Sequence, residues 1–307
     1  MKVALLAGGT GGTKLAHGFD LVLEAGELGV VANVGDDFDL HGLHVSPDID
    51  ALLYTLGGLI DAERGWGVQG DTFTAHQMLE RYGEPAWFRV GDADLATHVE
   101  RTWRLRSGAS LTDTTAAMAS ALGVASRILP ATDDRLRTRV VTDAGTIDFQ
   151  DYFVRLRQEP EVRGVSLDGL DSARPTTAVL DAIGAADLVV LGPSNPIVSI
   201  GPILALRGVR EALLAAHAPK VAVSPIVAGR ALKGPADRML VSLGHEATAV
   251  GVARLYAGLI DRFVLDEADA ALAPQVEALG MTADVLPTVM RSDEDRRSLA
   301  TALLALV

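Results

Sequence analysis

The chain has 307 residues, of which 49% are hydrophobic and 22% charged, with a net charge of −13 and no cysteine. These proportions are ordinary for a globular enzyme with a sizeable core. The acidic balance argues against a nucleic acid or an anionic membrane as the main partner, because those surfaces require clustered Lys and Arg. The lack of cysteine excludes disulfides, thiolate zinc sites and a cysteine nucleophile.

Neither a targeting segment nor a membrane span is expected. Met1 and Lys2 lead directly into an apolar run, which leaves no room for a signal peptide. No apolar stretch approaches the roughly 20 residues that a membrane-spanning helix needs. We therefore expect a cytoplasmic protein that binds no membrane.

The first motif is an apolar run, residues 3–7, that leads into a glycine cluster and then a helical pattern. The order predicts a strand, a tight loop and a helix, whose backbone N–H groups favour an anion. The spacing matches neither a Walker A loop nor the dinucleotide fingerprint, whose third glycine would fall at Lys14. A tight turn without a ligand is the alternative, but we interpret the cluster as a phosphate cradle: Gly8, Gly9, Thr10, Gly11, Gly12, Thr13 and Lys14.

Carboxylates follow the second predicted strand, residues 28–34. Asp36, Asp37 and Asp39 come directly after it, where the carboxyl end of a parallel strand would meet a ligand crevice. Ser46 and Pro47 then predict the N-cap and first residue of a helix. Asp48 could simply complement the dipole of that helix, whereas Asp50 points elsewhere and needs a second explanation.

The remaining chain alternates helix and strand, which predicts one α/β domain over residues 1–307. We expect a Rossmann-like, mostly parallel sheet flanked by helices, with an inserted α+β segment over residues 125–170. Turn-rich loops follow two further strands, at residues 192–202 and 224–230. Outside the insertion, the pattern predicts strands at 187–191, 220–223, 262–265 and 284–286, and helices that end near Ser107, begin at Ser110, span 246–261 and begin at Ser292.

The polar residues favour phosphoryl transfer over other chemistry. His41 and His44 form the only close histidine pair and lack an identifiable third zinc ligand. Ser194 lies between Pro193 and Asn195, which does not match the Gly-x-Ser-x-Gly elbow of a hydrolase. Carboxylates at strand ends are the ligands that Mg²⁺ prefers, and the ion would neutralise a diphosphate. Transfer to a hydroxyl then needs positioning and charge neutralisation.

Several of these segments together resemble the 2-phospho-L-lactate transferase family of coenzyme F-420 biosynthesis. The resemblance runs from the first strand to the last helix, and the combination is more specific than any single motif. It rests on Leu6–Gly12, Asn33–Asp37, Ser46–Asp50, Arg64–Gly67, Ala96–His98, Gly192–Pro196 and Ser224–Ile226.

The resemblance implies transfer of a phospho-lactyl or phospho-enolpyruvyl group from its guanosine diphosphate conjugate to the ribityl hydroxyl of the deazaflavin FO. GMP would be released, with Mg²⁺ as cofactor. Both substrates are small molecules, and no nucleic acid is implied. We also expect a homodimer.

The resemblance also implies roles for individual residues. Asp50 would be catalytic, and Asp37 and Asp50 would hold the metal. The deazaflavin would contact Asp36, Asp37, Asp50, Trp66 and Asp92. Besides the glycine cluster, the nucleotide would contact Ser194, Asn195, Ser199 and Ser224.

One position departs from the family pattern. The family commonly has Gly-Asp-Arg-Asp where this chain has Ala93 between Asp92 and Asp94, so an arginine expected near FO is missing. Arg89 or Arg101 could supply the charge instead. Two other classes remain open: a nucleotidyltransferase that turns over a nucleoside triphosphate, and a relative that binds nucleotide or deazaflavin without chemistry.

Overall fold

The computed structural model describes residues 1–307 and is built on a seven-stranded sheet. Every neighbouring pair of strands in this sheet is parallel, as predicted. The strands are, in spatial order, β14 Thr282–Leu286, β13 Arg262–Asp266, β10 Lys220–Val223, β9 Leu188–Leu191, β1 Val3–Ala7, β2 Leu28–Ala32 and β5 Arg127–Pro130.

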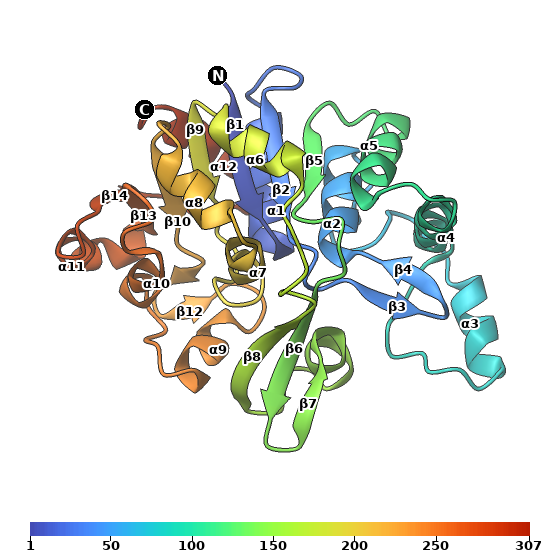
Figure 1. Ribbon diagram of the computed structural model, residues 1–307. Coiled ribbons are helices and arrows are strands. Elements are labelled where there is room, and N and C mark those ends of the chain that lie inside the picture. Colours follow the sequence, from blue (N-terminus) through green and yellow to red (C-terminus); the bar gives the residue numbers. More distant parts are fainter.

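The central strands are continuous apolar runs because both faces of the sheet are covered. Every residue of β1, β2 and β9 is buried, as expected for a parallel sheet between helical layers. In Figure 1, α6 and α8 lie in front of this sheet, with α1 and α12 behind it. The α-helices are α1 Gly9–Asp20, α2 Pro47–Leu56, α3 Thr74–Arg81, α4 Asp92–Arg106, α5 Leu111–Ala121, α6 Thr177–Gly184, α7 Ile200–Ala205, α8 Val209–Ala215, α9 Ala236–Ser242, α10 Ala249–Tyr256, α11 Ala273–Glu277 and α12 Asp293–Leu304.

The order of the strands reverses at β1. The chain first moves from β1 to β2 and β5 on one side, and later adds β9, β10, β13 and β14 on the other. The loops after β1 and β9 therefore leave the sheet in opposite directions, which opens a crevice at the carboxyl ends of these strands. This is the place where open α/β sheets bind ligands.

The predicted insertion, residues 125–170, begins too early. Its first strand, β5, is an edge strand of the main sheet and pairs with β2. A separate antiparallel sheet follows, with β6 Arg137–Thr142 between β7 Gly145–Asp148 and β8 Val162–Asp168. Figure 1 shows it beyond the carboxyl edge of the main sheet. A π-helical turn, Asp151–Arg155, lies between β7 and β8.

Two small hairpins and a 3₁₀ turn complete the fold. The hairpins are β3 Phe38–Leu40 with β4 Leu43–Val45, and β11 Ile226–Val227 with β12 Arg230–Ala231. The 3₁₀ turn is Glu267–Leu272. None of the helices combines the length and the apolar character that a bilayer crossing demands.

Several predicted boundaries shift. The second strand ends at Ala32 rather than residue 34, so Asn33 already lies beyond the sheet. The helix predicted over 246–261 is the shorter α10, because Thr248 caps its start through the N–H of Gly251. The predicted starts of α5 and α12 are confirmed, since Ser110 and Ser292 cap them by accepting from the N–H groups of Asp113 and Asp295.

Candidate active site at the carboxyl edge of the sheet

The glycine cluster forms a helix start rather than the predicted loop. Gly8 is the N-cap and α1 begins at Gly9, whose φ of 63° lies in the left-handed region that favours glycine. A Cβ at Gly12 would lie 2.5 Å from Ser194 Oγ, and one at Gly11 would clash with the carbonyl oxygen of Pro193. Close packing between α1 and the loop after β9 therefore requires these glycines.

Two of the four N–H groups that have no partner within α1 donate to side chains elsewhere in the protein. The first four N–H groups of a helix lack partners within the helix. Here Gly8 N–H donates to Ser194 Oγ at 3.3 Å, and Gly9 N–H donates to Asp48 Oδ1 at 2.7 Å. No side chain accepts from Thr10 or Gly11. The part of the predicted cradle that remains available to an anion is thus the pair of amides at Thr10 and Gly11.

Asp48 joins the ends of β1 and β2. Besides the bond from Gly9, its Oδ2 accepts from Asn33 Nδ2 at 2.9 Å. Burial raises the pKa of Asp48 to about 6, although the bonds from Gly9 and Asn33 oppose this shift. The carboxylate therefore complements the N-terminus of α1 as well as lying in the first turn of its own helix, α2.

Asp36 and Asp37 lie buried after β2, and each has one unpartnered oxygen. Asp37 Oδ2 accepts from Ser46 Oγ at 2.8 Å and lies 2.9 Å from His44 Nε2, whereas Asp37 Oδ1 has no partner. Asp36 Oδ1 also lacks one. Burial, and then the charge of Asp48, raises the pKa of Asp36 well above its usual range.

The sequence predicted Ser46 as the N-cap of α2, but its side chain does not cap this helix. Its hydroxyl instead donates to Asp37, and the cap position has no side-chain hydrogen bond. The predicted pair of histidines also separates, because His44 contacts Asp37 while His41 is an exposed turn residue. The sequence did not predict His44 as a partner of Asp37, since the contact depends on the β3–β4 hairpin.

Asp50 lies at the centre of a buried, charged network. The guanidinium of Arg101 donates to both of its carboxylate oxygens, and this arginine has no exposed surface. His98 lies between two acids, with Nδ1 3.6 Å from Asp50 Oδ2 and Nε2 3.5 Å from Asp94 Oδ1, and its Nε2 makes no hydrogen bond. Tyr54 donates to Asp94 at 2.7 Å. Arg101 thus compensates the charge of Asp50 from within the protein.

Burial sets the protonation states of this network. It raises the pKa of Asp94 to about 7, with the nearby charge of Asp50 as the second cause. Burial also lowers the pKa of His98 to about 4, against the opposing attraction of Asp50. At neutral pH His98 is uncharged, and Arg101 is the cation that faces Asp50.

Asp92 and Trp66 belong to a different part of the molecule. Asp92 accepts from the N–H groups of Thr74 and Ala75, at 3.1 and 2.9 Å, and so holds the start of α3 against the start of α4. Hydrogen bonds, first that from Thr72, lower the pKa of Asp92 to about 2. Trp66 is exposed and stacks with Arg64 at 5.3 Å. Neither side chain bonds to a residue at the strand ends.

The arginines considered as substitutes for Ala93 differ in position. Arg101 is buried against Asp50, as described above. Arg89 is exposed and lies over the ring of Phe73 at 4.2 Å. The residues of the Ala93 turn are themselves held by Asp71, which accepts from the N–H groups of Ala93 and Asp94.

Other predicted nucleotide residues have partners within the protein. Lys14 Nζ donates to the carbonyl oxygen of Met290 at 2.8 Å, which ties α1 to the segment before α12. Thr13 Oγ1 donates to Gly9, and Ser224 Oγ to the carbonyl of Ile226 at 2.8 Å. Asn195 Oδ1 accepts from Ile197 N–H at 2.9 Å. These side chains build the strand-end loops themselves.

Ser199 is the predicted hydroxyl closest to the glycine cluster without a hydrogen bond of its own. A Cβ at Gly8 would lie 2.8 Å from Ser199 Cβ and 2.7 Å from Asp48 Oδ2. The structure therefore brings Ser194 and Ser199, from the loop after β9, and Asp48, from α2, against the start of α1. These residues were separated by up to about 190 positions in sequence and meet only through the parallel sheet.

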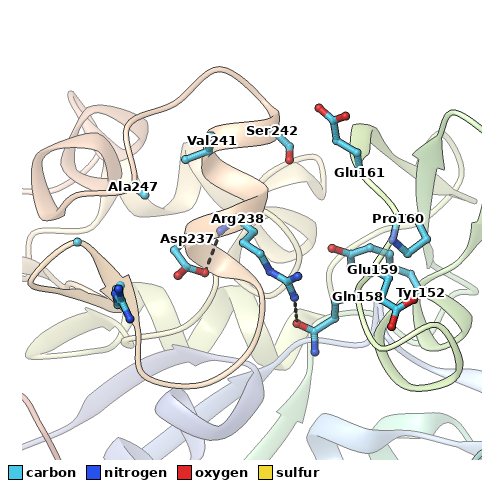
Figure 2. A pocket seen from close by; sticks show the side chains of 12 residues that line it. Tyr152, Gln158, Glu159, Pro160, Glu161, Asp237, Arg238, Val241, Ser242 and Ala247 are labelled. Atoms are coloured by element: carbon cyan, nitrogen blue, oxygen red, sulfur yellow. Dashed lines mark hydrogen bonds between the residues drawn. The ribbon is translucent and has the colours of Figure 1, made fainter.

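One cavity lies outside this cluster. It measures about 450 Å³, lies between α9 and the segment before β8, and contains none of the predicted site residues. In Figure 2, Arg238 reaches across it and donates to Gln158 Oε1, at 2.9 Å. The carboxylates of Glu159, Glu161 and Asp237 also line it, so we do not assign the phosphate site to it.

Comparison with known proteins shows full-length similarity to one family. Residues 3–293 match the family described as 2-phospho-L-lactate transferase CofD. A phosphoenolpyruvate transferase of Streptomyces griseus is 41% identical, covering 100% of this chain and 98% of its own. A 2-phospho-L-lactate transferase of Methanosarcina mazei is 40% identical, covering 96% and 97%.

Solved structures support the fold at greater evolutionary distance. Protein BH3568 of Bacillus halodurans superposes with a TM-score of 0.67 at 18% identity, covering 99% of both chains. A second structure of that protein describes it as a member of the UPF0052 family. The match over residues 3–293 and the relatives near 40% identity show that this chain belongs to the 2-phospho-L-lactate transferase family and is an enzyme of the transferase type.

Proposed function

We propose that this protein is a cytoplasmic, Mg²⁺-dependent transferase of coenzyme F-420 biosynthesis. It moves a phospho-lactyl or phospho-enolpyruvyl group from a guanosine diphosphate conjugate to the ribityl hydroxyl of the deazaflavin FO, and releases GMP. The names of its relatives support the two candidate donors. The observation that carries the proposal is the pairing of an open helix N-terminus with buried, unpartnered carboxylate oxygens at one edge of the sheet.

The buried acids fit a magnesium ion that is completed by its substrate. Asp37 Oδ1 and Asp36 Oδ1 are buried without partners, and such oxygens gain from a hard cation. No group of three or more acidic or histidine side chains is arranged to hold a metal. This agrees with Mg²⁺, which is commonly bound by one or two carboxylates plus substrate phosphates and water.

The residues have distinct roles in this proposal. Asp37 would hold the ion, whose positive charge would neutralise the diphosphate. The N–H groups of Thr10 and Gly11 bind phosphate oxygens. Asp50, which was predicted as a second metal ligand, is already paired with Arg101 through both oxygens, so we assign it to orienting the acceptor hydroxyl.

The bond changes need little more than this arrangement. The ribityl oxygen bonds to the phosphorus that carries the three-carbon acid, while the bond from that phosphorus to the GMP oxygen breaks. The hydroxyl proton leaves toward Asp50 or solvent. Because the transition state of such transfers is loose, positioning and charge neutralisation supply most of the rate.

Reaction with FO tests the proposal directly. Purified protein is incubated with FO, Mg²⁺ and each guanosine diphosphate conjugate in turn, and the deazaflavin product and GMP are followed by mass spectrometry. We expect product and GMP in equal amounts from at least one donor, and none with EDTA. Turnover of a nucleoside triphosphate in their place would favour the nucleotidyltransferase class, and binding of FO without product would favour a non-catalytic relative.

The exposed side of α4 supports a homodimer. Val99 and Trp103 are 49% and 62% exposed and lie one turn apart, while the opposite side of the helix carries His98 and Arg101 into the site. Ala96 extends the apolar stripe. Glu100 and Arg104 border it with opposite charges, so the surface is complementary to a second copy of itself across a two-fold axis.

Light scattering after size-exclusion chromatography tests this interface. We expect the wild type at the mass of a dimer and Trp103→Glu at that of a monomer. Leu214→Glu, on α8, is the matched control because Leu214 is also 62% exposed. A monomeric wild type, or a Trp103→Glu variant that stays dimeric, would contradict the assignment of this face.

A further inference from the structure

A second cavity, of about 350 Å³, lies where β3 meets the three-stranded sheet. Of the carboxylates singled out in the sequence only Asp39 lines it, and no residue that was assigned to a ligand does so. Its aromatic wall comes from Phe38 and Trp87, and its basic side from three arginines at alternate positions of one extended segment. These are Arg135, Arg137 and Arg139.

The cavity adjoins the acids that we assign to the metal. Phe38 follows Asp37 directly in the chain. Gln150, which also lines the cavity, donates from Nε2 to the carbonyl oxygen of Asp36 at 3.1 Å. Thr138, which follows Arg137 in the chain, donates from its N–H to the carbonyl oxygen of Gly35 at 2.7 Å. The backbone just before Asp37 therefore lies against residues that line this cavity or neighbour its lining.

Two of the arginines have no acidic partner. Arg139 pairs with Asp148, and lies 3.7 Å from Asp168. The cavity's other acids are Asp151, which pairs with Arg155 at 2.7 Å, and Asp39, which is exposed. Arg135 and Arg137 lie within 4.0 Å of no carboxylate, so a positive charge remains uncompensated.

Of Arg135 and Arg137, Arg137 says more about a ligand, because its side chain is only 8% exposed. Its one hydrogen bond runs from Nη1 to the carbonyl of its neighbour, Leu136, at 3.1 Å. A buried guanidinium is costly unless an anion pairs with it. Although the chain has a net charge of −13, no protein carboxylate has taken that place.

The aromatic side chains of the cavity indicate what kind of group the rest of the ligand carries. The ring of Phe38 lies 6.2 Å from Trp87, with 32° between their planes, and 4.8 Å from Phe88 in an edge-on contact. Such a wall suits a small, flat or apolar group. An arginine beside it suits a carboxylate, which accepts two parallel hydrogen bonds from a guanidinium.

We propose that this cavity binds the carboxylate of the three-carbon acid carried by the donor, with Arg137 as its principal partner and Arg135 as a second cation. The inference rests on the proposed function, because that function places a phosphate-linked acid at Asp37. Lactyl and enolpyruvyl groups share the carboxylate. The donor is then held at both ends, by the start of α1 and by Arg137, with the reacting phosphorus between them.

Binding measured without FO tests this inference separately from turnover. Titration calorimetry in Mg²⁺ compares each donor conjugate with GDP, which lacks the three-carbon acid. For the wild type we expect the donor to bind more tightly than GDP. Arg137→Gln should lose roughly 10- to 100-fold in donor affinity, the range of a charge-assisted hydrogen bond, while its GDP affinity stays unchanged.

Three controls keep the result interpretable. Arg163→Gln alters an exposed arginine on β8 of the same sheet and should bind both ligands as the wild type does. Arg137→Lys should recover part of the lost affinity. Because Arg137 lacks a partner in the free protein, Arg137→Gln should melt at the same temperature as the wild type or higher, so loss of fold cannot mimic loss of binding.

Different failures have different meanings. Equal losses of donor and GDP affinity in Arg137→Gln would overturn the carboxylate assignment, and so would a loss of FO affinity alone, which would give the cavity to the acceptor. Unchanged donor affinity would overturn it too. If the wild type transfers no group from either donor to FO, the proposed function itself fails, whatever the binding of Arg137→Gln.

Discussion

Asp37 and Asp50 were predicted to act alike, yet the regions around them differ. Asp37, after β2, keeps one buried oxygen without a partner, while its other oxygen is held by Ser46 and His44. Asp50, in α2, has both oxygens on Arg101 and is flanked by His98. A carboxylate without an internal partner is prepared to bind a cation from outside, whereas one with an internal partner organises its surroundings.

The largest expected effect is that of Asp37→Asn on catalysis. If Asp37 holds Mg²⁺, its loss should lower kcat by roughly 10²- to 10⁴-fold, because neutralisation of the diphosphate is the main contribution to rate. The measurement is steady-state turnover over a Mg²⁺ titration. Asp171→Asn is the control, since that carboxylate is exposed and lines neither cavity; a comparable loss in both variants would refute the distinction.

Removing the internal partner of Asp50 should act on stability instead. Arg101→Met leaves a buried, unpaired carboxylate and should lower the free energy of unfolding by about 3–5 kcal/mol, as measured by urea denaturation. Arg104→Met breaks the exposed pair with Glu100 on the same helix and should cost less than about 1 kcal/mol. Equal costs would show that the buried network contributes no more than a surface pair.

The close packing of the glycine cluster can also be tested by its effect on stability. Gly11→Ala should destabilise the protein by about 3 kcal/mol, because the added methyl group clashes with the carbonyl of Pro193. Gly184→Ala, at the end of α6, meets no atom within 4 Å and should be neutral or slightly stabilising. Thermal unfolding compares the two variants, and a tolerated Gly11→Ala would contradict the close approach of α1 to the β9 loop.

The pH dependence of stability should separate His98 from Asp94. The folded pKa of Asp94, about 7, lies above its ordinary value near 3.9, so its contribution to stability is full below pH 4 and is lost as pH rises to 7. The folded pKa of His98, about 4, lies below its ordinary 6.5, so its contribution is full above pH 6.5 and is lost as pH falls to 4.

The two variants should therefore shift in opposite directions relative to the wild type. Between pH 4 and 6.5, Asp94→Asn should gain stability with rising pH and His98→Gln should lose it, each by on the order of 2 kcal/mol. Urea denaturation at pH 4.5, 5.5 and 6.5 measures both. Differences that do not change with pH would show that neither group has a shifted pKa.

The arginines of the second cavity show a signal that the sequence contained. Arg135, Arg137 and Arg139 recur with a period of two, which places them on one face of a strand. Whether such a face is solvated or lines a cavity depends on what packs against it. That information came only with the position of Trp87 and of β3, which lie about 50 and about 100 residues earlier in the chain.

The sequence by itself determined the parallel sheet and the edge of the sheet at which polar residues gather. Continuous apolar runs mark strands that are buried on both faces, and polar residues after such strands must gather at one edge. Cap residues fixed the starts of α5 and α12, because capping is a local interaction.

Only the tertiary structure decided which polar groups are free to bind a ligand. Lys14 was predicted to contact the nucleotide, but it bonds to Met290, 276 residues away. Asp50 meets Arg101 and Asp48 meets Gly9 through packing of helices that share no sequence motif. Residue type and local spacing establish what a side chain can bind, whereas the packing of distant elements establishes whether a partner within the protein already occupies it.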